Sequence, residues 1–411
     1  MQGQALSDLR VVELGRYIAA PYCSKLLADL GAEVVKVEDP QGDPARYAGP
    51  FPGDKPHAER SALFLYLNTN KKSITLDVRA PGGARILQQL LRDTDVLVED
   101  NAPGEAASLG LDFRSLHRSN PRLIVTSITP FGQTGPYRDF KATDLIANHM
   151  SGLAFSTTSR ITDASQEPLQ AGGKQGDFTA GLTGAVGTML ALFSRDLSGE
   201  GQHVDISIQE SLAAFVRWEV GFYTHDFDGL YKQLWAKRAS GSGKGATGLF
   251  PCKDGYVSMG TREQYQWEAF VDMLGNQQLR EDPRFSSILL RILNWPMIEP
   301  LVLDWMSKHT KEEIFRESQA RRVPAFPCNT TGEVYESAQI KAREYFVEVE
   351  HPELGLVTCP GAPYKLSRTP WRVRQTAPRL GEHNQEILCG WLGYGKEDVL
   401  RLGETGLGKC D

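Results

Sequence analysis

The sequence predicts an α/β protein with a large domain, built on a doubly wound, mostly parallel, Rossmann-like sheet, and a smaller α+β domain. Near the N-terminus, the strand patterns LRVVEL and AEVVKVE enclose the helical segment SKLLADLG. Strand-like segments recur at 73–78, 95–100 and 122–128, each followed by a helical segment. Strands that alternate with helices form a mostly parallel sheet covered on both faces. The length of 411 residues exceeds what one core usually holds, which indicates two domains.

A change in composition indicates the boundary between the two domains. After about residue 222 the chain reads YKQLWAKRASGSGKGATG, which is basic, rich in glycine and without periodicity; FPCKDGYVSMG follows with the pattern of a hairpin. After about residue 339 the chain becomes loops and strands with prolines. We therefore expect the first part of the large domain at 1–210, a linker at 211–225, the small domain at 226–330, a linker at 331–339, and the rest of the large domain at 340–411.

Charge and hydropathy argue against several classes of partner. The net charge of −6 and the lack of a long Lys/Arg run disfavour nucleic acid, because successive phosphates would meet no matching cations. The N-terminus lacks the pattern of a secretory signal, and the longest nearly uncharged helical run, 182–193, is too short to span a bilayer. The cysteines form no C-x-x-C pair and the histidines show no ligand spacing, so we expect reduced thiols and no metal. The sequence predicts a cytoplasmic protein without a nucleic-acid or membrane partner.

Two segments are similar to nucleotide-binding loops but lack the defining patterns. The loop after the first strand reads GRYIAAP rather than G-x-G-x-x-G, so the backbone cannot approach a pyrophosphate as in NAD-binding proteins. The segment GSGKGATG lacks the spacing of a phosphate loop and the Ser or Thr that should follow Lys244. Gly241, Gly243 and Gly245 suit either a mobile flap whose amides lie against a reacting group or a flexible linker.

One carboxylate lies where a glycine-rich loop turns into a long helix. It is Asp177, within GGKQGDFTAGLTGAVGTMLALF at 172–193. One face of this helix is apolar, and another carries small residues such as Gly184 and Gly187, which predicts a very closely packed neighbour. Taken alone, Asp177 has the commoner role of an N-cap that accepts bonds from amides of the first turn. The glycines also suit a nucleophile, because they leave its carboxylate uncrowded.

Several segments together favour the second interpretation. They are the opening L-x-x-L-R-V-V-E-L, LLADLGAEVVKVEDPQGD, LNTNKKSITLDV, NPRLIVTSITPFGQTGP, QGDFTAGLTGAVGTMLALFSRDLSGEGQHVDISI, and KLSRTPW with APRLGEHNQEIL near the end. In this order, and over nearly the whole chain, they resemble the class III coenzyme A transferases of the CaiB/BaiF type, the family of formyl-CoA:oxalate CoA-transferase and the carnitine CoA-transferases. The runs LADLGAEVVKVE and FGQTGP are specific to that family.

The resemblance implies that Asp177 is the catalytic nucleophile of a CoA-transferase. Its carboxylate would attack the thioester of an acyl-CoA donor, giving a mixed anhydride and free CoA thiolate, and the thiolate would then form an aspartyl-CoA thioester. CoA would pass from this thioester to a carboxylic acid, with no metal, flavin or other tightly bound cofactor. We expect the helix start to lower the pKa of Asp177 and the amides of the glycine loop to stabilise the oxyanion.

The resemblance also implies where CoA binds and how the chains assemble. It points to Lys141 for the phosphates and to the loop with Asp100, Asn101 and Gly104 for the adenosine end. The CoA would lie across the carboxyl ends of the strands, as ligands do in open α/β sheets. The family further implies an interlocked homodimer, in which two chains pass through each other.

Two positions depart from the oxalate enzyme of the family. Ser108 replaces an arginine, and Asp39 stands where that enzyme has a basic residue. We therefore take three other cations as substitute candidates for the CoA phosphates, Lys71, Lys72 and Arg138, each of which equally suits a solvated surface charge.

Side-chain type is the basis for a predicted substrate pocket. Tyr17, Ile18, Phe140 and Ile208 suggest a less polar acyl pocket than one for oxalate. Their positions in the sequence do not identify the donor or the acceptor acid.

A related racemase branch offers an alternative function on the same fold. It uses a histidine directly before the acid that matches Asp144, together with the acid that matches Asp177, for proton transfer. This chain has Thr143 at that position, which disfavours racemisation. A non-catalytic CoA-binding protein is a third alternative, which the retained Asp177 disfavours.

Overall fold

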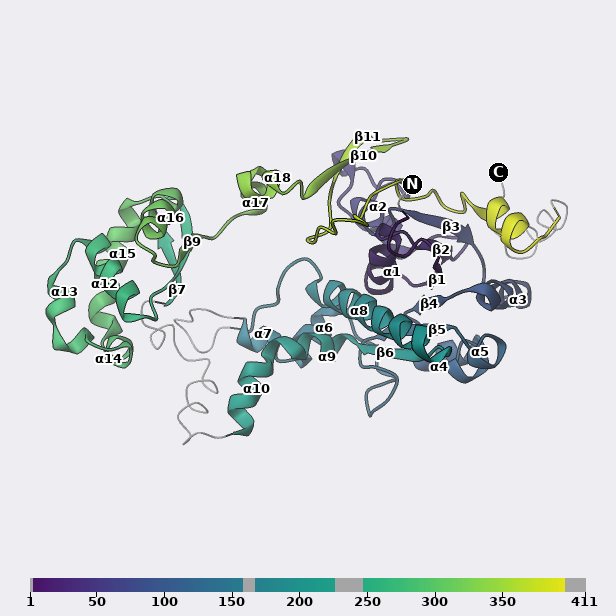
Figure 1. Ribbon diagram of the computed structural model, residues 1–411, viewed down its shortest axis with the longest axis horizontal. Coiled ribbons are helices and arrows are strands. Elements are labelled where there is room, and N and C mark those ends of the chain that lie inside the picture. Colours follow the sequence, from purple (N-terminus) through teal and green to yellow (C-terminus); the bar gives the residue numbers. More distant parts are fainter. Residues whose placement is uncertain (1–2, 158–166, 226–246, 396–411) are drawn as a thin grey trace. The chain divides into compact units, whose positions relative to one another are not determined.

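The computed structural model of the protein describes residues 3–157, 167–225 and 247–395 (Figure 1). The chain forms two compact units. The large unit comprises 1–151, 171–215 and 342–411, and the small unit comprises 152–170 and 216–341. Unlike the predicted boundaries, these units assign 152–170 to the small unit, because the chain leaves the large unit before Asp177 and returns to it.

The large unit is built on a six-stranded parallel sheet. Its strands are β1 (Arg10–Leu14), β2 (Glu33–Glu38), β3 (Lys71–Thr75), β4 (Val96–Glu99), β5 (Ile124–Thr129) and β6 (His203–Ser207), in the order β3-β2-β1-β4-β5-β6. The order reverses between β1 and β4, so the loops after these two strands separate at the carboxyl edge. That position is the topological switch point, where open α/β sheets bind ligands.

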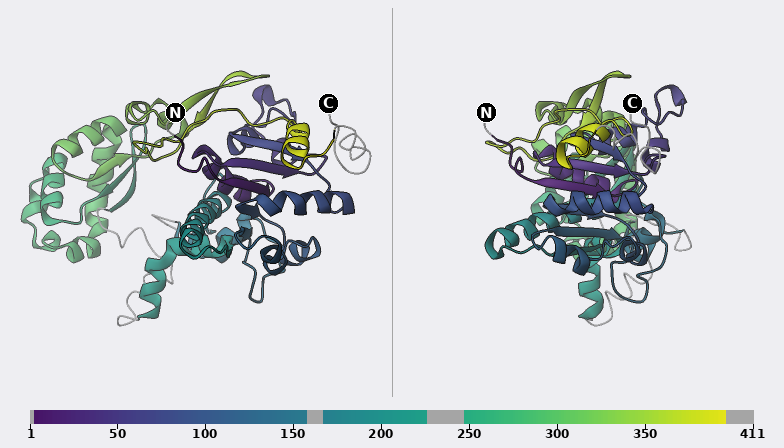
Figure 2. Two further views of the ribbon diagram at one scale, coloured as in Figure 1. Left: turned by 45° about the vertical axis from the view of Figure 1, so that its right-hand side comes forward. Right: turned by 90° about the vertical axis from the view of Figure 1, so that its right-hand side faces the viewer.

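Helices cover both faces of this sheet, which confirms the predicted doubly wound α/β fold (Figure 2). They are α1 (Ala19–Asp29), α2 (Ala62–Leu67), α3 (Pro81–Leu90), α4 (Pro103–Ser108), α5 (Phe113–Ser119), α6 (Asp144–Met150), α8 (Gln175–Ser198) and α9 (Ile208–Ala213). Alternation along β5 separates the faces: Val125 packs in a core with residues of α3 and α5, whereas Thr126 bonds Thr188 of α8 at 2.7 Å.

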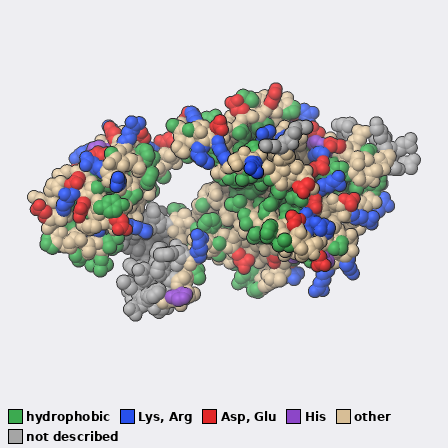
Figure 3. Space-filling view, viewed as in Figure 1, with side chains coloured by type: hydrophobic (Ala, Val, Ile, Leu, Met, Phe, Trp, Pro, Cys, Tyr) green, Lys and Arg blue, Asp and Glu red, His purple; other side chains and the backbone are tan. Residues whose placement is uncertain are grey.

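The small-residue face of α8 packs closely against the sheet and α1, as predicted. A Cβ added at Gly181 would lie 2.6 Å from the carbonyl oxygen of Ala19, and one at Gly184 would lie 2.8 Å from Cδ1 of Ile128. Glycine inside a helix costs about 1 kcal/mol of helix stability relative to alanine. The close packing that these glycines permit offsets this cost. Most of the larger apolar side chains of α8 instead lie exposed on the opposite face (Figure 3), namely Leu182, Val186, Met189, Leu190, Phe193 and Leu197.

The C-terminal part of the large unit adds a hairpin and a final helical turn. Strands β10 (Phe346–His351) and β11 (Gly355–Pro360) pair antiparallel. The last described helical element is one π-helical segment, Glu386–Trp391, whose Ile387 and Leu388 complete the core beside α3.

The small unit has its own core and its own sheet. The predicted hairpin is β7 (Thr247–Cys252) and β8 (Gly255–Gly260), with β9 (Ala325–Pro327) added antiparallel. The helices are α7 (Leu153–Ser156), α10 (Arg217–Thr224), α12 (Gln264–Leu274), α13 (Gln278–Glu281), α14 (Ile288–Leu293), α15 (Trp295–Lys308), α16 (Lys311–Ala320), α17 (Thr331–Glu336) and α18 (Ala338–Ala342). Trp267, Phe270 and Trp295 are buried at its centre. Across the described ranges, no helix has the length and apolar character needed to cross a membrane.

Candidate active site

Side chains from β2 and from the segments that follow β2 and β4 hold the loop after β1 at the switch point. The Lys36 ammonium donates to the carbonyl of Gly15 at 3.0 Å, and it pairs with Asp43 at 2.6 Å. Asp43 accepts the backbone N–H of Tyr17 at 3.0 Å, and Asp100 accepts that of Arg16 at 2.8 Å. Tyr17 has a φ of 66°, a left-handed conformation that a non-glycine residue adopts when its surroundings impose it. The loop is therefore rigidly positioned.

The predicted adenosine loop follows β4 and lies on the other side of the switch point. Burial raises the pKa of Asp100 to about 8, and its Oδ1 atom has no hydrogen-bond partner among the described residues. Both the backbone and the side-chain N–H of Asn101 donate to Glu99, at 2.7 and 3.0 Å. Gly104 is exposed, and nothing lies within 4 Å of where its Cβ would be. This loop leaves room for a ligand beside Arg16.

Two of the predicted phosphate contacts lie in unsuitable places. Lys71 is fully buried, and its ammonium donates to Glu13, the carbonyl of Pro21 and Asn68 at 2.7, 2.7 and 2.9 Å. Lys72 is at the amino end of β3, where it pairs with Glu33 at 2.5 Å and Glu386 at 2.7 Å.

These positions correct the sequence interpretation of both lysines. The three acceptors of Lys71 occupy all three donors of its ammonium group. Lys72 is at the edge of the sheet opposite to the one where ligands bind. We withdraw both from the candidate phosphate contacts.

The loop after β5 supplies the remaining predicted cations. Lys141 is exposed, and within the described part of the chain its ammonium has no partner. Arg138 is exposed and pairs with Asp139 at 3.3 Å. Phe140 is 59% exposed, and its ring centroid lies 5.1 Å from that of Tyr137. The geometry leaves Lys141 available for an anion.

Helix α8 begins two residues before Asp177, which overturns the N-cap interpretation. The N-cap is Lys174, with a left-handed φ of 58°, and Asp177 is the third residue of the helix. The capping acceptor comes from another helix: Oδ1 of Asp144, the first residue of α6, accepts the N–H of Gly176 at 2.7 Å and that of Asp177 at 3.2 Å. A Cβ at Gly176 would lie 2.5 Å from this oxygen, so glycine permits the contact. No described residue donates a hydrogen bond to the Asp177 carboxylate.

The electrostatic environment of Asp177 also differs from the prediction. Burial, followed by the negative charge of Asp144, raises the pKa of Asp177 from 3.8 to about 7, while Lys174 opposes the shift. The expected lowering assumed that the helix start would act on the Asp177 carboxylate. Asp144 instead occupies the amides there. Near neutral pH a large fraction of Asp177 is ionised, and a carboxylate of higher pKa is a more basic nucleophile.

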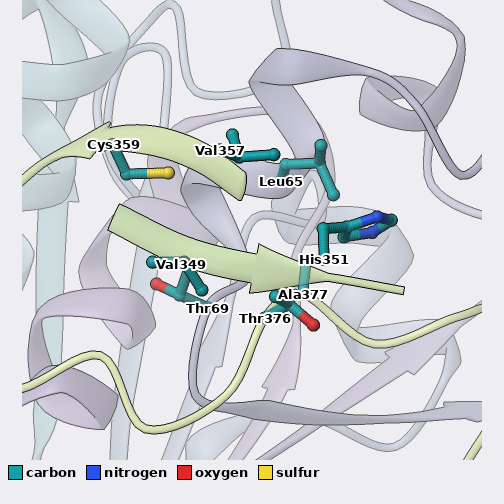
Figure 4. A pocket seen from close by; sticks show the side chains of 8 residues that line it. All are labelled: Leu65, Thr69, Val349, His351, Val357, Cys359, Thr376 and Ala377. Atoms are coloured by element: carbon teal, nitrogen blue, oxygen red, sulfur yellow. The ribbon is translucent and has the colours of Figure 1, made fainter. Parts of the chain in front are cut away.

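The predicted acyl-pocket residues do not form one described pocket. Ile18 is 1% exposed and Ile208 is 8% exposed, so both belong to the interior. Tyr17 packs against a small core that includes Phe64, and Phe140 is on the exposed loop. A described pocket lies elsewhere, beneath the hairpin β10–β11 (Figure 4), and is lined by Leu65, Thr69, Val349, His351, Val357, Cys359, Thr376 and Ala377. Gly241, Gly243 and Gly245 lie outside the described residues.

Sequence reasoning missed three groups around Asp177. Lys174 is the cation beside it, and Asp144 had been considered solely as the neighbour of Thr143. The ring of Phe178 contacts Tyr22 edge-on, with centroids 5.0 Å apart. The lysine was available as a sequence signal, three residues before the acid, whereas no local pattern connects Asp144 or Tyr22 with this helix. Nor do the described residues contain three or more His, Cys, Asp or Glu side chains gathered as a metal site.

Comparison with known proteins assigns the chain to a family. The model for CoA-transferase family III matches residues 6–384. The chain is 33% identical to succinyl-CoA--D-citramalate CoA-transferase of Chloroflexus aurantiacus, covering 97% of this chain and 96% of the relative. It is 31% identical to succinyl-CoA:(R)-benzylsuccinate CoA-transferase subunit BbsE of Thauera aromatica, covering 98% of each. A CaiB/BaiF family protein from Brucella suis, of known crystal structure, has a TM-score of 0.81 at 28% identity, covering 95% of this chain and all of the other.

Proposed function

We propose, from the premise that the chain belongs to CoA-transferase family III, that it moves coenzyme A from an acyl-CoA donor to a carboxylic acid through a covalent intermediate on Asp177. One observation carries the role of Asp177: its carboxylate lies at the start of α8 without a hydrogen-bond donor among the described residues, because Asp144 takes the capping bonds. A carboxylate that capped the helix would have to break its hydrogen bonds to the amides before it could attack. The Asp177 carboxylate has no such bonds to break.

The first step exchanges a sulfur substituent for an oxygen substituent on the donor. An oxygen of the ionised Asp177 forms a bond to the thioester carbonyl carbon, the carbon–sulfur bond breaks, and CoA leaves as a thiolate. The product is an anhydride between the acyl group and Asp177. No redox change occurs, so the step needs no redox cofactor.

The next three steps transfer CoA. The thiolate attacks the aspartyl carbonyl of the anhydride and releases the donor acid, which leaves an aspartyl-CoA thioester. The acceptor carboxylate then attacks the aspartyl carbonyl of this thioester, the carbon–sulfur bond breaks, and CoA leaves again as a thiolate, which gives an anhydride between Asp177 and the acceptor. The thiolate finally attacks the acceptor carbonyl of this second anhydride, which forms the acceptor's thioester and releases the Asp177 carboxylate. Each step joins acyl derivatives of similar reactivity, which divides one difficult transfer into easier ones.

The chain offers a path for CoA along the carboxyl edge of the sheet. We place the adenosine end beside Asp100, Asn101 and Gly104, because this loop lies at the switch point. Lys141 is the candidate for the phosphates, with Arg138 as a second cation. The amides of Gly241, Gly243 and Gly245 are assigned the oxyanion and the exclusion of water by analogy with the family.

The substrate acids are proposed as a class. The names of two relatives include succinyl-CoA as the donor. A less polar acyl group remains our prediction, but Ile18 and Ile208 no longer support it because both are buried. Phe140 and Tyr17 are the remaining candidates from the predicted pocket.

We also propose a homodimer, formed through the exposed apolar face of α8. Leu182, Val186, Leu190 and Phe193 are 51%, 53%, 66% and 68% exposed on this helix. A contiguous exposed apolar surface is typical of an interaction site. A second copy is the partner that the family implies, and the interlocked arrangement predicted above suits this role. A fully active monomer in light scattering would contradict it. The cytoplasmic location stays a prediction from the sequence.

A transfer assay tests the function directly. Acyl-CoA donors are incubated with a panel of carboxylic acids, and new thioesters are separated by chromatography. We expect transfer by the native protein, a loss of about 10³-fold or more in Asp177→Ala, and full activity in Asp196→Ala, an exposed acid on the same helix. Exchange of the donor's α-proton with solvent deuterium, without CoA transfer, would instead favour the racemase alternative.

A further inference from the structure

Asp144 reaches the start of α8 from a helix that is distant in the sequence. It is the first residue of α6, it is buried, and its Oδ1 atom accepts two consecutive amides, those of Gly176 and Asp177. These are the amides that an N-cap side chain normally satisfies. The local N-cap, Lys174, is a cation and cannot accept them.

The local packing leaves little freedom in this contact. A Cβ at Gly176 would lie 2.5 Å from Oδ1 of Asp144 and 3.0 Å from Cδ1 of Leu212, which belongs to α9. The start of α8 therefore meets the start of α6 and the end of α9 at Gly176. A glycine here has a steric reason, since any larger residue would displace the carboxylate of Asp144.

We propose that Asp144 is a positioning residue for the nucleophile: by capping α8 from outside, it fixes the backbone of Asp177 and leaves the Asp177 carboxylate free to attack. Asp144 acts through the backbone and does not touch the substrate. This inference rests on the proposed function, because it requires Asp177 to be the group that attacks.

The geometry explains why an acid at position 144 suits a nucleophile at position 177. Helix starts attract negative charge, and an aspartate in the first turn would otherwise fold its own carboxylate onto the free amides. With those amides occupied by Asp144, the carboxylate of Asp177 has no competing internal bond. The charge of Asp144 also acts on Asp177 through space, and Lys174 opposes it. These are the two charged groups that face Asp177 among the described residues.

The test separates the first half-reaction from later steps. Release of CoA thiol is followed in a single turnover by rapid mixing, with the acyl-CoA that the native protein cleaves fastest among succinyl-CoA, acetyl-CoA and benzoyl-CoA. The variants are Asp144→Ala, Asp144→Asn and Gly176→Ala. The matched control is Asp112→Ala, because Asp112 caps α5 locally by accepting the N–H of Ser115 at 3.0 Å.

We expect the release rate to fall about 100-fold in Asp144→Ala and Gly176→Ala, since a shift of about 1 Å in a reacting group has this effect. The KM for the acyl-CoA should stay within about threefold, because neither Asp144 nor Gly176 is among the predicted CoA contacts. Asp144→Asn should keep the rate within about tenfold, because its amide oxygen still accepts both bonds. The rising limb of its pH profile should move to lower pH, since a neutral side chain no longer opposes ionisation of Asp177.

Each outcome decides between the two proposals. If Asp144→Ala and Gly176→Ala release CoA at the rate of the native protein, this inference is wrong and the proposed function stands. An Asp144→Asn variant as slow as Asp144→Ala would also overturn it, because capping would then not be the role of Asp144. If Asp112→Ala also slows the release of CoA, general instability of the large unit explains the slow release by the Asp144 variants, and the inference is wrong. Absence of release from every donor by the native protein would reject the proposed function as well. If Asp144→Ala does not fold, the other two variants decide.

Discussion

Replacing Asp177 with asparagine should stabilise the protein above neutral pH, although it removes the proposed nucleophile. Burial and then Asp144 raise the pKa of Asp177 from 3.8 to about 7 in the folded chain, against the effect of Lys174. The unfolded chain ionises near the ordinary value. As the pH rises between these two values, the unfolded state loses its proton first, and the folded state loses stability. Asparagine has no proton to lose and avoids this cost.

The size of the effect follows from the pKa difference. A change from 3.8 to about 7 corresponds to at most about 4 kcal/mol, at about 1.4 kcal/mol per pH unit. This destabilisation is fully present above about pH 7, falls to less than half of its full value at pH 5, and disappears below about pH 4. Solvent screening of a partly buried carboxyl reduces it further.

Urea unfolding at pH 8 and pH 5 measures the difference. Asp177→Asn should have a higher free energy of unfolding than the native protein at pH 8, and the gain should shrink at pH 5. Asp196→Asn, an exposed acid on α8, serves as the control and should show no such gain. An Asp177→Asn variant that is no more stable than the native protein at pH 8, or whose gain is equal at both pH values, would contradict a raised pKa of Asp177 in the folded chain.

Three further predictions follow from single contacts. In steady-state kinetics, Lys141→Ala should raise the KM for acyl-CoA about tenfold and leave kcat nearly unchanged, because about 1.4 kcal/mol of phosphate binding is lost. The control Lys72→Ala should change neither constant, because Lys72 pairs with Glu386. An equal effect of the two variants would contradict the assignment of Lys141 to the CoA phosphates. Gly181→Ala should lower the free energy of unfolding by about 1–3 kcal/mol, because its Cβ would lie 2.6 Å from the Ala19 carbonyl, whereas Gly82→Ala, with nothing within 4 Å, should not in the same denaturation experiment. Lys174→Met should move the rising limb of the single-turnover pH profile to higher pH, because the cation lowers the pKa of Asp177; an unmoved limb would argue against that charge interaction.

The order of strands and helices could be predicted because it depends on local periodicity. Apolar strands with helices between them leave a parallel sheet as the simple solution, and β1, β2, β4 and β5 lie within a few residues of the expected segments. The close packing of α8 could also be predicted from the sequence, because glycines weaken a helix and their helical spacing therefore indicates a face that packs closely.

The lysine pair shows what periodicity cannot supply. Lys71 and Lys72 are adjacent in the sequence, and a strand directs neighbouring side chains to opposite faces. Lys71 thus enters the interior, which is tolerable because Glu13 of β1 lies there; burial opposes ionisation of Glu13, but Lys36 and Lys71 outweigh it and lower the pKa of Glu13 to about 2. Predicting that two lysines and a glutamate pair across three strands requires knowledge of the register of the sheet, which a single sequence does not provide.

The start of α8 depends on a contact that is long in sequence and short in space. Asp144 and Asp177 are 33 residues apart, and the capping bonds link α6 to α8. Rules for caps describe residues within a few positions of the helix end. Taken alone, they therefore favoured a cap at Asp177, whereas the capping acceptor is Asp144 and no described residue donates a hydrogen bond to the Asp177 carboxylate.

The most direct test of covalent catalysis by Asp177 is mass spectrometry of the intact protein after incubation with acyl-CoA donors, followed by peptide mapping. We predict an adduct with the mass of CoA on the peptide that contains Asp177, its removal by hydroxylamine, and no adduct in Asp177→Ala. Transfer activity in a protein that never carries CoA, or an adduct on a different residue, would contradict a covalent role of Asp177 and return it to a structural role.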